Sequence, residues 1–266
     1  MERLQESETR GAQTLRRGLT ILKLLARNQP AGLRMSDIGR RASLNKATAV
    51  RLTRTLVEER FVTFDPSTRK YSLGPETFAV GLAAEPAYAL QRLAAPFLRS
   101  LALETGDWVF FSVKQGFEAI CLSRESGDIP YPASALKIGD CHPLCIGAGG
   151  IAILAALSDR EIEQAISAGE SSMANNYPEV SVSMVQTMVR ETREKGYSVI
   201  PGTIVRGYWG LGVPLLQKDG RPVAAIVLVT SEKRLNSTRQ VALGERMRRL
   251  AAELMSGEIH NSYSAT

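Results

Sequence analysis

Three side chains that can bind metal or act as nucleophiles lie within five residues. Cys141, His142 and Cys145 are of types that bind zinc, and a cysteine at the start of a helix can be activated by the helix dipole. A zinc site needs a fourth ligand, and the chain's other histidine, His260, lies in a polar segment near the end. No histidine downstream is placed to act as a base. We therefore expect no metal, no cofactor and no cysteine catalysis, while redox sensing by Cys141 or Cys145 stays open.

A second set of side chains suits contact with nucleic acid. Arg51 and Arg54 can reach guanine edges or phosphates, and Val50 can meet a thymine methyl group. Ala47 and Thr48 are short enough to let a backbone approach the bases. Together with Ser36 and three basic residues nearby, they form the predicted DNA-contacting set: Ser36, Lys46, Ala47, Thr48, Val50, Arg51, Arg54, Arg69 and Lys70.

Two helices are expected before this basic set. The first carries apolar residues at three- and four-residue steps, which predict one buried stripe. These residues are Leu15, Leu19, Leu22, Leu25 and Ala26. A second, short helix is expected over Asp37–Ala42, with Ser36 as its N-cap because a serine oxygen can accept a hydrogen bond from the exposed amides.

A third helix and a hairpin position the basic residues. The helix is expected over Lys46–Glu59, and one face of it is apolar: Ala49, Leu52, Thr53 and Leu56. Two β-prone runs, Phe61–Phe64 and Arg69–Leu73, flank an Asp-Pro turn and predict a hairpin. Three helices followed by a hairpin are typical of a winged helix-turn-helix, in which the third helix enters the major groove and the hairpin touches the backbone or the minor groove.

The distribution of charge agrees with this interpretation. The 266 residues are enough for two domains of ordinary size, and their formal net charge is +6. Residues 1–80 hold 15 Lys and Arg against 8 Asp and Glu, whereas residues 81–266 hold 18 against 19. A basic domain joined to a nearly neutral one is expected when the first binds a polyanion and the second has another task.

The composition also limits the compartment. Three cysteines cannot form a closed disulfide framework, and the first residues have no apolar stretch typical of a signal peptide. The longest apolar runs are far shorter than the roughly 18 residues that a membrane helix needs. We expect a cytoplasmic protein with no membrane partner.

The second segment predicts helices around an antiparallel sheet. Helices are expected over Pro75–Ala89, which can link the domains, and over Pro96–Glu104, Leu144–Leu157, Asp159–Ala168, Val182–Lys195 and Asn236–Met255. Strands are expected over Trp108–Val113, Ile120–Leu122, Ala133–Ile138, Tyr197–Ile200, Leu211–Leu216 and Val223–Val229. Ser158 is expected to cap one helix and Gly196 to end another. The glycine-rich run Gly147–Gly150 follows no strand directly, so it indicates close helix packing rather than dinucleotide binding.

Five strings of the first segment, in this order and spacing, resemble the DNA-binding domain of IclR-type bacterial transcription regulators. They are Leu19–Leu25, Met35–Ala42, Asn45–Leu52, Thr55–Val62 and Tyr71–Gly74. The second segment resembles the GAF-like effector-binding domain of the same family through Gly139–Leu144, Glu194–Tyr197, Gly212–Leu215 and Val223–Ile226. The resemblance implies an α+β fold, operator DNA and a small-molecule effector as partners, and a homodimer or a dimer of dimers.

The resemblance also implies where the effector binds. The family's cavity positions correspond to Gly147, Ala148, Ile200, Tyr208, Gly210, Val227 and Val229. The chain departs from the family at Cys145, Gly147 and Ile151, where His, a hydroxyl residue and Lys are common. Because a compact hydroxy- or oxo-acid would find few hydrogen-bond donors there, we expect an aromatic or apolar-bodied carboxylate whose charge meets the helix N-terminus near Gly147.

The expected organisation is a winged helix-turn-helix over residues 13–74, a linker helix over 75–89, an effector domain over 90–256 and a flexible tail over 257–266. The expected function is a ligand-responsive DNA-binding regulator that is not an enzyme. Two alternatives remain: a thiol-based redox regulator that uses Cys141 or Cys145, and an enzyme or sensor module whose basic domain binds something other than specific DNA.

Overall fold

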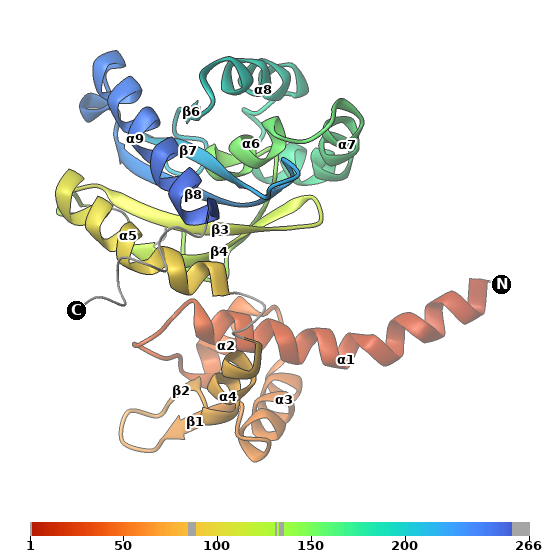
Figure 1. Cartoon of the computed structure of the whole chain (residues 1–266). Helices are drawn as coiled ribbons and strands as arrows, with labels where there is room; N and C mark the ends of the chain where they lie inside the picture. The colour runs from red at the N-terminus through yellow and green to blue at the C-terminus, as the bar shows by residue number, and fades with distance from the viewer. Residues whose placement is uncertain (1, 85–88, 131, 133–135, 257–266) are drawn as a thin grey trace. The chain divides into compact units, whose positions relative to one another are not determined.

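The computed structural model describes residues 2–84, 89–130, 132 and 136–256, with the side chains described from residue 12 onward. The chain forms two compact units, residues 1–89 and 90–266 (Figure 1). The predicted tail over 257–266 and residues 85–88 of the linker helix expected over Pro75–Ala89 lie outside the described residues. In the described part of the chain, no helix has the length and apolar character that crossing a membrane requires.

The first unit contains three helices, a hairpin and a further helix. The helices are α1 (Glu2–Ala26), α2 (Met35–Arg41), α3 (Lys46–Glu58) and α4 (Pro75–Ala84). The hairpin pairs β1 (Val62–Asp65) with β2 (Lys70–Leu73), so that Phe64 faces Tyr71. Its core contains residues from all these parts except α4: Ile21, Leu25, Leu33, Ile38, Leu52 and Val62. The winged helix-turn-helix predicted from the sequence is thus present.

Two local predictions in this unit are wrong. Ser36 does not cap α2, because the helix begins at Met35, two residues before the predicted start, and its N-cap is Arg34, with no side-chain hydrogen bond. The stripe predicted for α1 is only partly buried: Leu25 is fully buried, but 65% of Leu15 and 47% of Leu19 are exposed. The outer residues of the stripe extend beyond the small core that the unit provides.

The second unit is a six-stranded antiparallel sheet in the order β5-β4-β3-β8-β7-β6. The strands are β3 (Trp108–Gln115), β4 (Glu118–Glu125), β5 (Cys141–Pro143), β6 (Ser198–Ile200), β7 (Tyr208–Leu216) and β8 (Pro222–Ser231). The helices are α5 (Ala89–Thr105), α6 (Gly147–Ala155), α7 (Asp159–Asn176), α8 (Val182–Lys195) and α9 (Ser237–Ser256), with the short 3-10 helix η2 (Glu232–Arg234) before α9.

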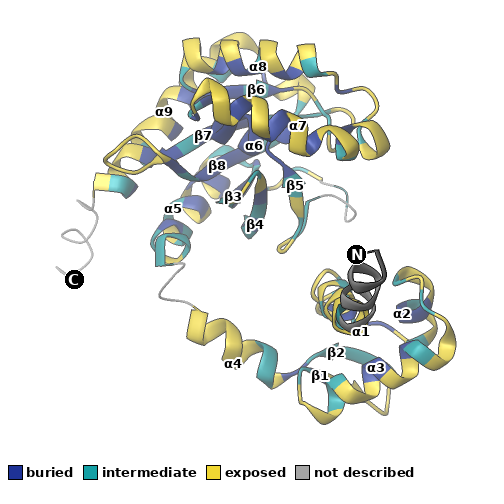
Figure 2. Ribbon diagram, turned by 90° about the vertical axis from the view of Figure 1, so that its right-hand side faces the viewer, coloured by how far each residue is buried: buried dark blue, intermediate teal, exposed yellow. Residues whose placement is uncertain are grey.

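The sheet separates two apolar cores because strand side chains alternate between its faces. Phe110 and Val227 face the core that α6, α7 and α8 cover, whereas Phe111 and Leu228 face the core that α5 and α9 cover. Figure 2 shows the buried residues concentrated along the strands and on the helix faces next to them. This is the mixed α+β architecture with an antiparallel sheet that the sequence predicted.

Several predicted boundaries in the second unit are also wrong. The expected helix over Leu144–Leu157 starts only at Gly147, because Cys141–Pro143 pair as β5 with the edge of β4 and residues 144–146 form the turn that follows. The expected helix over Pro96–Glu104 begins at Ala89 and continues through Pro96. Part of the strand expected over 133–138 lies outside the described residues, and residues 136–138 are not a strand. The helix that follows Ser158 continues to Asn176.

The glycine-rich start of α6 allows the helix to lie directly on the sheet. A Cβ at Gly149 would lie 2.7 Å from Val227 Cγ2, and a Cβ at Gly212 would lie 2.4 Å from the Ala148 carbonyl oxygen. Ser198 Oγ donates a 2.7 Å hydrogen bond to that same oxygen. Close packing is therefore the structural role of this run.

Candidate functional site

Helix α3 presents one buried and one exposed face. Asn45 Oδ1 accepts a 2.8 Å hydrogen bond from the Thr48 amide and caps the helix. Ala49, Leu52 and Thr53 are buried against the core. The opposite face carries the predicted DNA-contacting residues of this helix, of which Thr48 is half-buried and the others are exposed: Lys46, Ala47, Val50, Arg51 and Arg54. The spacing thus places the predicted residues on a single solvent-facing surface.

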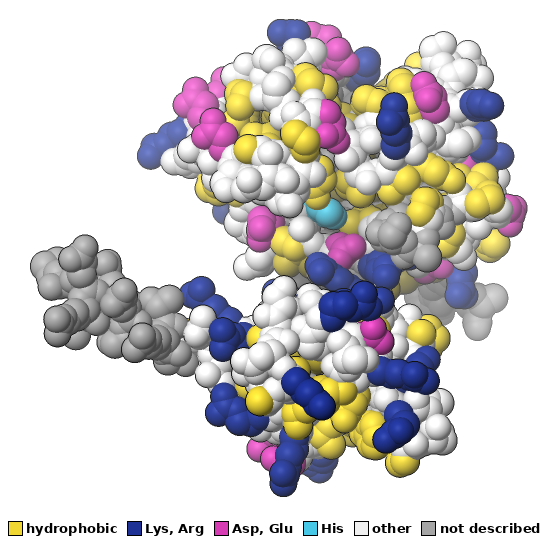
Figure 3. All heavy atoms as spheres, turned by 180° about the vertical axis from the view of Figure 1, so that it is seen from behind, with side chains coloured by type: hydrophobic (Ala, Val, Ile, Leu, Met, Phe, Trp, Pro, Cys, Tyr) yellow, Lys and Arg dark blue, Asp and Glu magenta, His cyan; other side chains and the backbone are white. Residues whose placement is uncertain are grey.

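The arginines of α3 differ in their surroundings. Arg54 Nε donates to Glu58 Oε1 at 2.8 Å, an ion pair between successive turns. No ion pair or hydrogen bond of the Arg51 side chain is found among the described residues. Figure 3 shows Lys and Arg side chains over much of the visible face of the first unit. A DNA phosphate or base edge would therefore find Arg51 available, and would compete with Glu58 for Arg54.

The hairpin has a firmly held turn and an anchored base. Asp65 accepts hydrogen bonds from Ser67 and Thr68, and these bonds lower the pKa of its carboxyl group to about 2. Arg69 is exposed and has a φ of 56°. Lys70 Nζ donates to the Ala31 carbonyl oxygen at 2.9 Å, so this lysine also binds within the unit. Ser36 is exposed in the first turn of α2.

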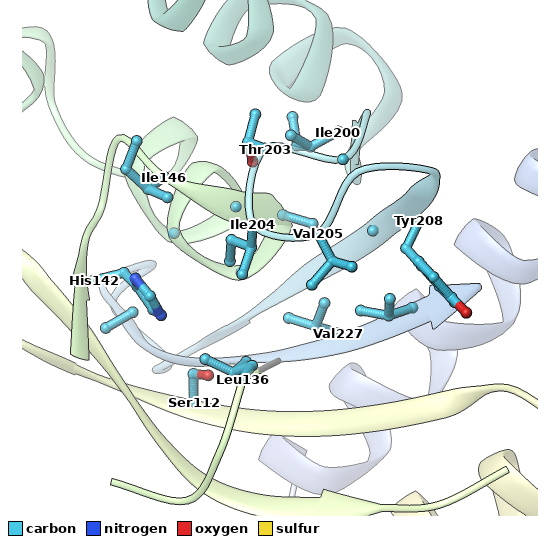
Figure 4. Close-up of a pocket in the computed structure, with 18 of the residues that line it drawn as sticks. Ser112, Leu136, His142, Ile146, Ile200, Thr203, Ile204, Val205, Tyr208 and Val227 are labelled. Carbon is cyan, nitrogen blue, oxygen red and sulfur yellow. The ribbon is translucent and has the colours of Figure 1, made fainter. Parts of the chain in front are cut away.

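The second unit contains a pocket between α6 and the sheet (Figure 4). All seven of the predicted effector-binding residues line it: Gly147, Ala148, Ile200, Tyr208, Gly210, Val227 and Val229. They come from the start of α6, from β6, β7 and β8, so the sheet and the helix together form the walls. The free space is about 60 Å³. The side chains among these seven are apolar except for that of Tyr208.

Further lining residues were not predicted as pocket residues. They include Ser112 on β3, Cys121 on β4, His142 on β5, and the segment Pro201–Val205 between β6 and β7. His142 pairs with Ala119, which also lines the pocket, but this register was not available from the sequence because β5 itself was not predicted. Nothing in the sequence pattern shows where the side chains of the irregular segment point.

Polar groups fix both ends of the pocket. His142 Nδ1 and Tyr177 Oη lie 2.6 Å apart, and burial, together with the charge of Asp140, raises the pKa of Tyr177. Tyr208 Oη donates a 2.5 Å hydrogen bond to the Pro130 carbonyl oxygen. These contacts hold two of the larger polar side chains in place. The walls between them are mainly apolar.

The cysteines differ in their exposure. Burial raises the pKa of the Cys145 thiol to about 11 and that of Cys121 to about 12, so both remain protonated near neutral pH. Cys141 is exposed. Among the described residues, no group of three His, Cys, Asp or Glu side chains is arranged to hold a metal ion. A redox role would therefore depend on Cys141.

The chain thus combines a winged helix-turn-helix unit, which has a basic exposed helix face, with an α+β unit that contains a mainly apolar pocket. Residues 14–66 match the IclR helix-turn-helix domain, and residues 87–256 match the C-terminal domain of the bacterial transcriptional regulator IclR. The chain belongs to the IclR family of bacterial transcriptional regulators, which have a DNA-binding domain and an effector domain.

Several known proteins resemble the whole chain. The HTH-type transcriptional repressor AllR of Escherichia coli K12 is 28% identical over 247 residues, covering 92% of this chain and 90% of AllR. An IclR regulator from Alicyclobacillus acidocaldarius superimposes with a TM-score of 0.72 at 23% identity, over 91% of this chain and 97% of that one. An IclR homolog from Microbacterium hydrocarbonoxydans, solved in complex with 4-hydroxybenzoate, superimposes with a TM-score of 0.71 at 21% identity. The match covers 94% of this chain and 100% of that one. At these identities the solved structures support the fold.

Proposed function

We propose that this regulator binds operator DNA through α3 and the β1–β2 hairpin and is controlled by an aromatic or apolar-bodied carboxylic acid in the pocket beneath α6. The observation that carries the proposal is the apolar lining of that pocket by the seven predicted residues. In the proposed domain organisation, residues 13–74 bind DNA, residues 75–89 link the two domains and residues 90–256 bind the effector. The 4-hydroxybenzoate complex of the Microbacterium homolog supports the ligand class.

The effector class follows from the cost of removing polar groups from water. A small dicarboxylate or glyoxylate would lose hydration over its whole surface and find few donors among these walls, which costs several kcal/mol. An aromatic acid buries an apolar ring and leaves one charge, which the N-terminus of α6 can stabilise. That helix has no side-chain cap at Ile146, so its first amides are available to an anion.

A thermal-shift panel tests this class. Benzoate and 4-hydroxybenzoate are expected to raise the melting temperature, because a ligand that binds only the folded state stabilises it. Benzyl alcohol, with the same ring and no charge, is the matched control and is expected to stabilise the protein less. Stabilisation by glyoxylate or small dicarboxylates, with none by the aromatic acids, would overturn the proposal.

Operator binding is tested with substitutions that remove equal charge at different places. Arg51→Ala is expected to weaken binding to the operator by about 1–3 kcal/mol if Arg51 contacts a base. Arg190→Ala, which removes an exposed arginine of α8 in the second unit, is the control and should leave affinity nearly unchanged. Affinity is measured by gel-shift titration at fixed salt. Equal operator affinity of the wild type, Arg51→Ala and Arg190→Ala would refute the assignment of α3 as the DNA-contacting helix.

The Arg54–Glu58 ion pair offers a second test of the same surface. Glu58→Gln releases Arg54, and exposed pairs of this spacing contribute about 0.3–0.5 kcal/mol, so DNA affinity should rise about twofold beyond any general charge effect. Glu59→Gln removes the same charge from an adjacent exposed position and measures that general effect. Identical affinities of the two variants would show that Arg54 does not contact DNA.

We also propose that a second copy of the chain covers the exposed apolar face of α1 and α4. No residue of α4 is buried, and Phe78 and Leu82 are 69% and 55% exposed. Exposed apolar surface of this kind is typical of an interface, and a dimer would present two recognition helices to two half-sites. Leu82→Glu should shift the protein to monomer in sedimentation experiments, whereas Met184→Glu on exposed α8 should not. A monomeric wild-type protein would refute this.

A further inference from the structure

The segment between β6 and β7 places one of its own side chains in the pocket. Ile204 points into the space between the start of α6 and the sheet (Figure 4). A Cβ built on Gly147 would lie 2.8 Å from Ile204 Cδ1, so the tip of this side chain lies against the first residue of α6. Ile204 therefore occupies the end of the pocket where the carboxylate is expected.

The remaining space is too small for an aromatic acid. The free volume is about 60 Å³, and a water molecule needs about 10–15 Å³ on the same kind of measure. The pocket as it stands has room for only a few water molecules, whereas ligand pockets usually measure about 300–1,000 Å³. A benzoate ring and the Ile204 side chain cannot occupy the site together.

Few hydrogen bonds tie the segment to the rest of the unit. Two of its backbone bonds are internal, between the Thr203 amide and the Pro201 oxygen and between the Tyr208 amide and the Val205 oxygen, and the Glu232 amide donates to the Gly207 oxygen at its end. Gly207, near its end, has a φ of 81° and open space around it. Between these ends, Pro201, Thr203, Ile204 and Val205 line the pocket.

We propose that Ile204 is an internal competitor of the effector. In the free protein, Ile204 occupies the pocket beside Gly147, and the effector binds by displacing it together with the segment Pro201–Gly207. This inference rests on the proposed function, since it concerns the same site. It assigns to Ile204 the control of effector affinity, because an effector cannot bind at the start of α6 while this side chain lies there. Binding thereby moves a surface segment that carries the exposed Arg206.

The first test needs no ligand. Ile204→Ala weakens the contact that holds the segment, so trypsin should cleave after Arg206 roughly tenfold faster, measured against cleavage after Lys218 in the β7–β8 turn of the same sample. Leu216→Ala is the matched control, because Leu216 is a similarly exposed apolar residue of β7 outside this pocket. Unchanged cleavage after Arg206 in Ile204→Ala would overturn the proposal. Ile204→Val, a milder change, should give an intermediate rate.

The second test measures affinity by calorimetry. Benzoate should bind Ile204→Ala roughly tenfold more tightly than wild type, because no side chain has to be displaced. Weaker binding would show that Ile204 is a wall that contacts the ligand, and would overturn the proposal. Benzene serves as a neutral probe of an opened apolar cavity. If benzene binds Ile204→Ala and not wild type while benzoate binds neither, the internal competitor is supported and only the aromatic-acid class is refuted.

Discussion

Replacing Gly212 with alanine tests the close packing of α6 on the sheet. The added methyl group would lie 2.4 Å from the Ala148 carbonyl oxygen, about 1 Å inside the 3.4 Å at which ordinary contact begins. The obstacle is backbone within a buried helix, so α6 must move away from β7. Overpacking of this kind costs about 1–3 kcal/mol.

The same movement disturbs a buried hydrogen bond. Ser198 Oγ donates to the Ala148 oxygen at 2.7 Å, and Ser198 is fully buried. Loss of this bond leaves Ser198 Oγ with only its longer 3.3 Å contact to the Gly212 carbonyl oxygen and adds about 1–3 kcal/mol. The expected destabilisation of Gly212→Ala is therefore about 2–6 kcal/mol, and for a unit of this size each kcal/mol lowers the melting temperature by about 2–4 °C.

The free energy of unfolding of the full chain is measured by denaturant titration, and its melting temperature is measured separately by calorimetry. Gly81→Ala is the matched control, because a Cβ at Gly81 in α4 meets nothing within 4 Å. That substitution should stabilise the helix by up to about 1 kcal/mol, since alanine is the better helix former. A free energy of unfolding for Gly212→Ala within about 0.5 kcal/mol of wild type would refute the packing argument.

Three further predictions concern single groups. Thr53 Oγ1 is buried with no hydrogen-bond partner among the described residues, so Thr53→Val should raise the free energy of unfolding by about 1 kcal/mol, measured by denaturant titration. In the folded protein, iodoacetamide near neutral pH should alkylate the exposed Cys141 and spare Cys145, whose pKa is raised to about 11; mass spectrometry checks this. The pKa of the Asp65 carboxyl group is about 2 in the folded protein, below its ordinary 3.8. The stability that this group contributes is therefore complete above about pH 4 and is lost as the pH falls from 4 to 2. An NMR titration of Asp65, together with hydrogen exchange of the hairpin amides, checks this.

Short-range signals in the sequence predicted the elements that depend on them. Helix α8 has the predicted bounds Val182–Lys195 and ends at Gly196, which has a φ of 75° that favours glycine. Ser158 caps α7 as predicted, and Glu161 completes a capping box with it. Each of these features is determined by a few neighbouring residues, so no knowledge of distant contacts was needed.

Several of the wrong predictions depended on distant contacts, whereas the predicted Ser36 cap of α2 rested on a local signal alone. Cys141–Pro143 became a strand because the edge of β4 was available for pairing, and nothing local to these residues indicates that. Leu15 and Leu19 have the spacing of a buried stripe, yet they extend beyond the core of their own unit. Periodicity shows that a face is apolar, but the surrounding fold decides what covers it.

The candidate pocket shows the same limit. The resemblance to a family located seven lining residues, and their role in binding an effector stays a prediction. The residues from the irregular segment, Thr203, Ile204 and Val205, were not predicted, because a loop has no period from which side-chain direction can be inferred. They are also the residues that decide how much space an effector finds.

The hairpin of the first unit is joined to the chain before α2, which determines how it would meet DNA. Leu33 and Tyr71 exchange two backbone hydrogen bonds of 3.0 and 2.8 Å, and a Cβ at Gly32 would lie 2.9 Å from the Tyr71 oxygen. The Lys70 bond to Ala31 reinforces this junction. The hairpin is thus held against the rest of its unit, so DNA binding should carry little entropy cost for folding this element.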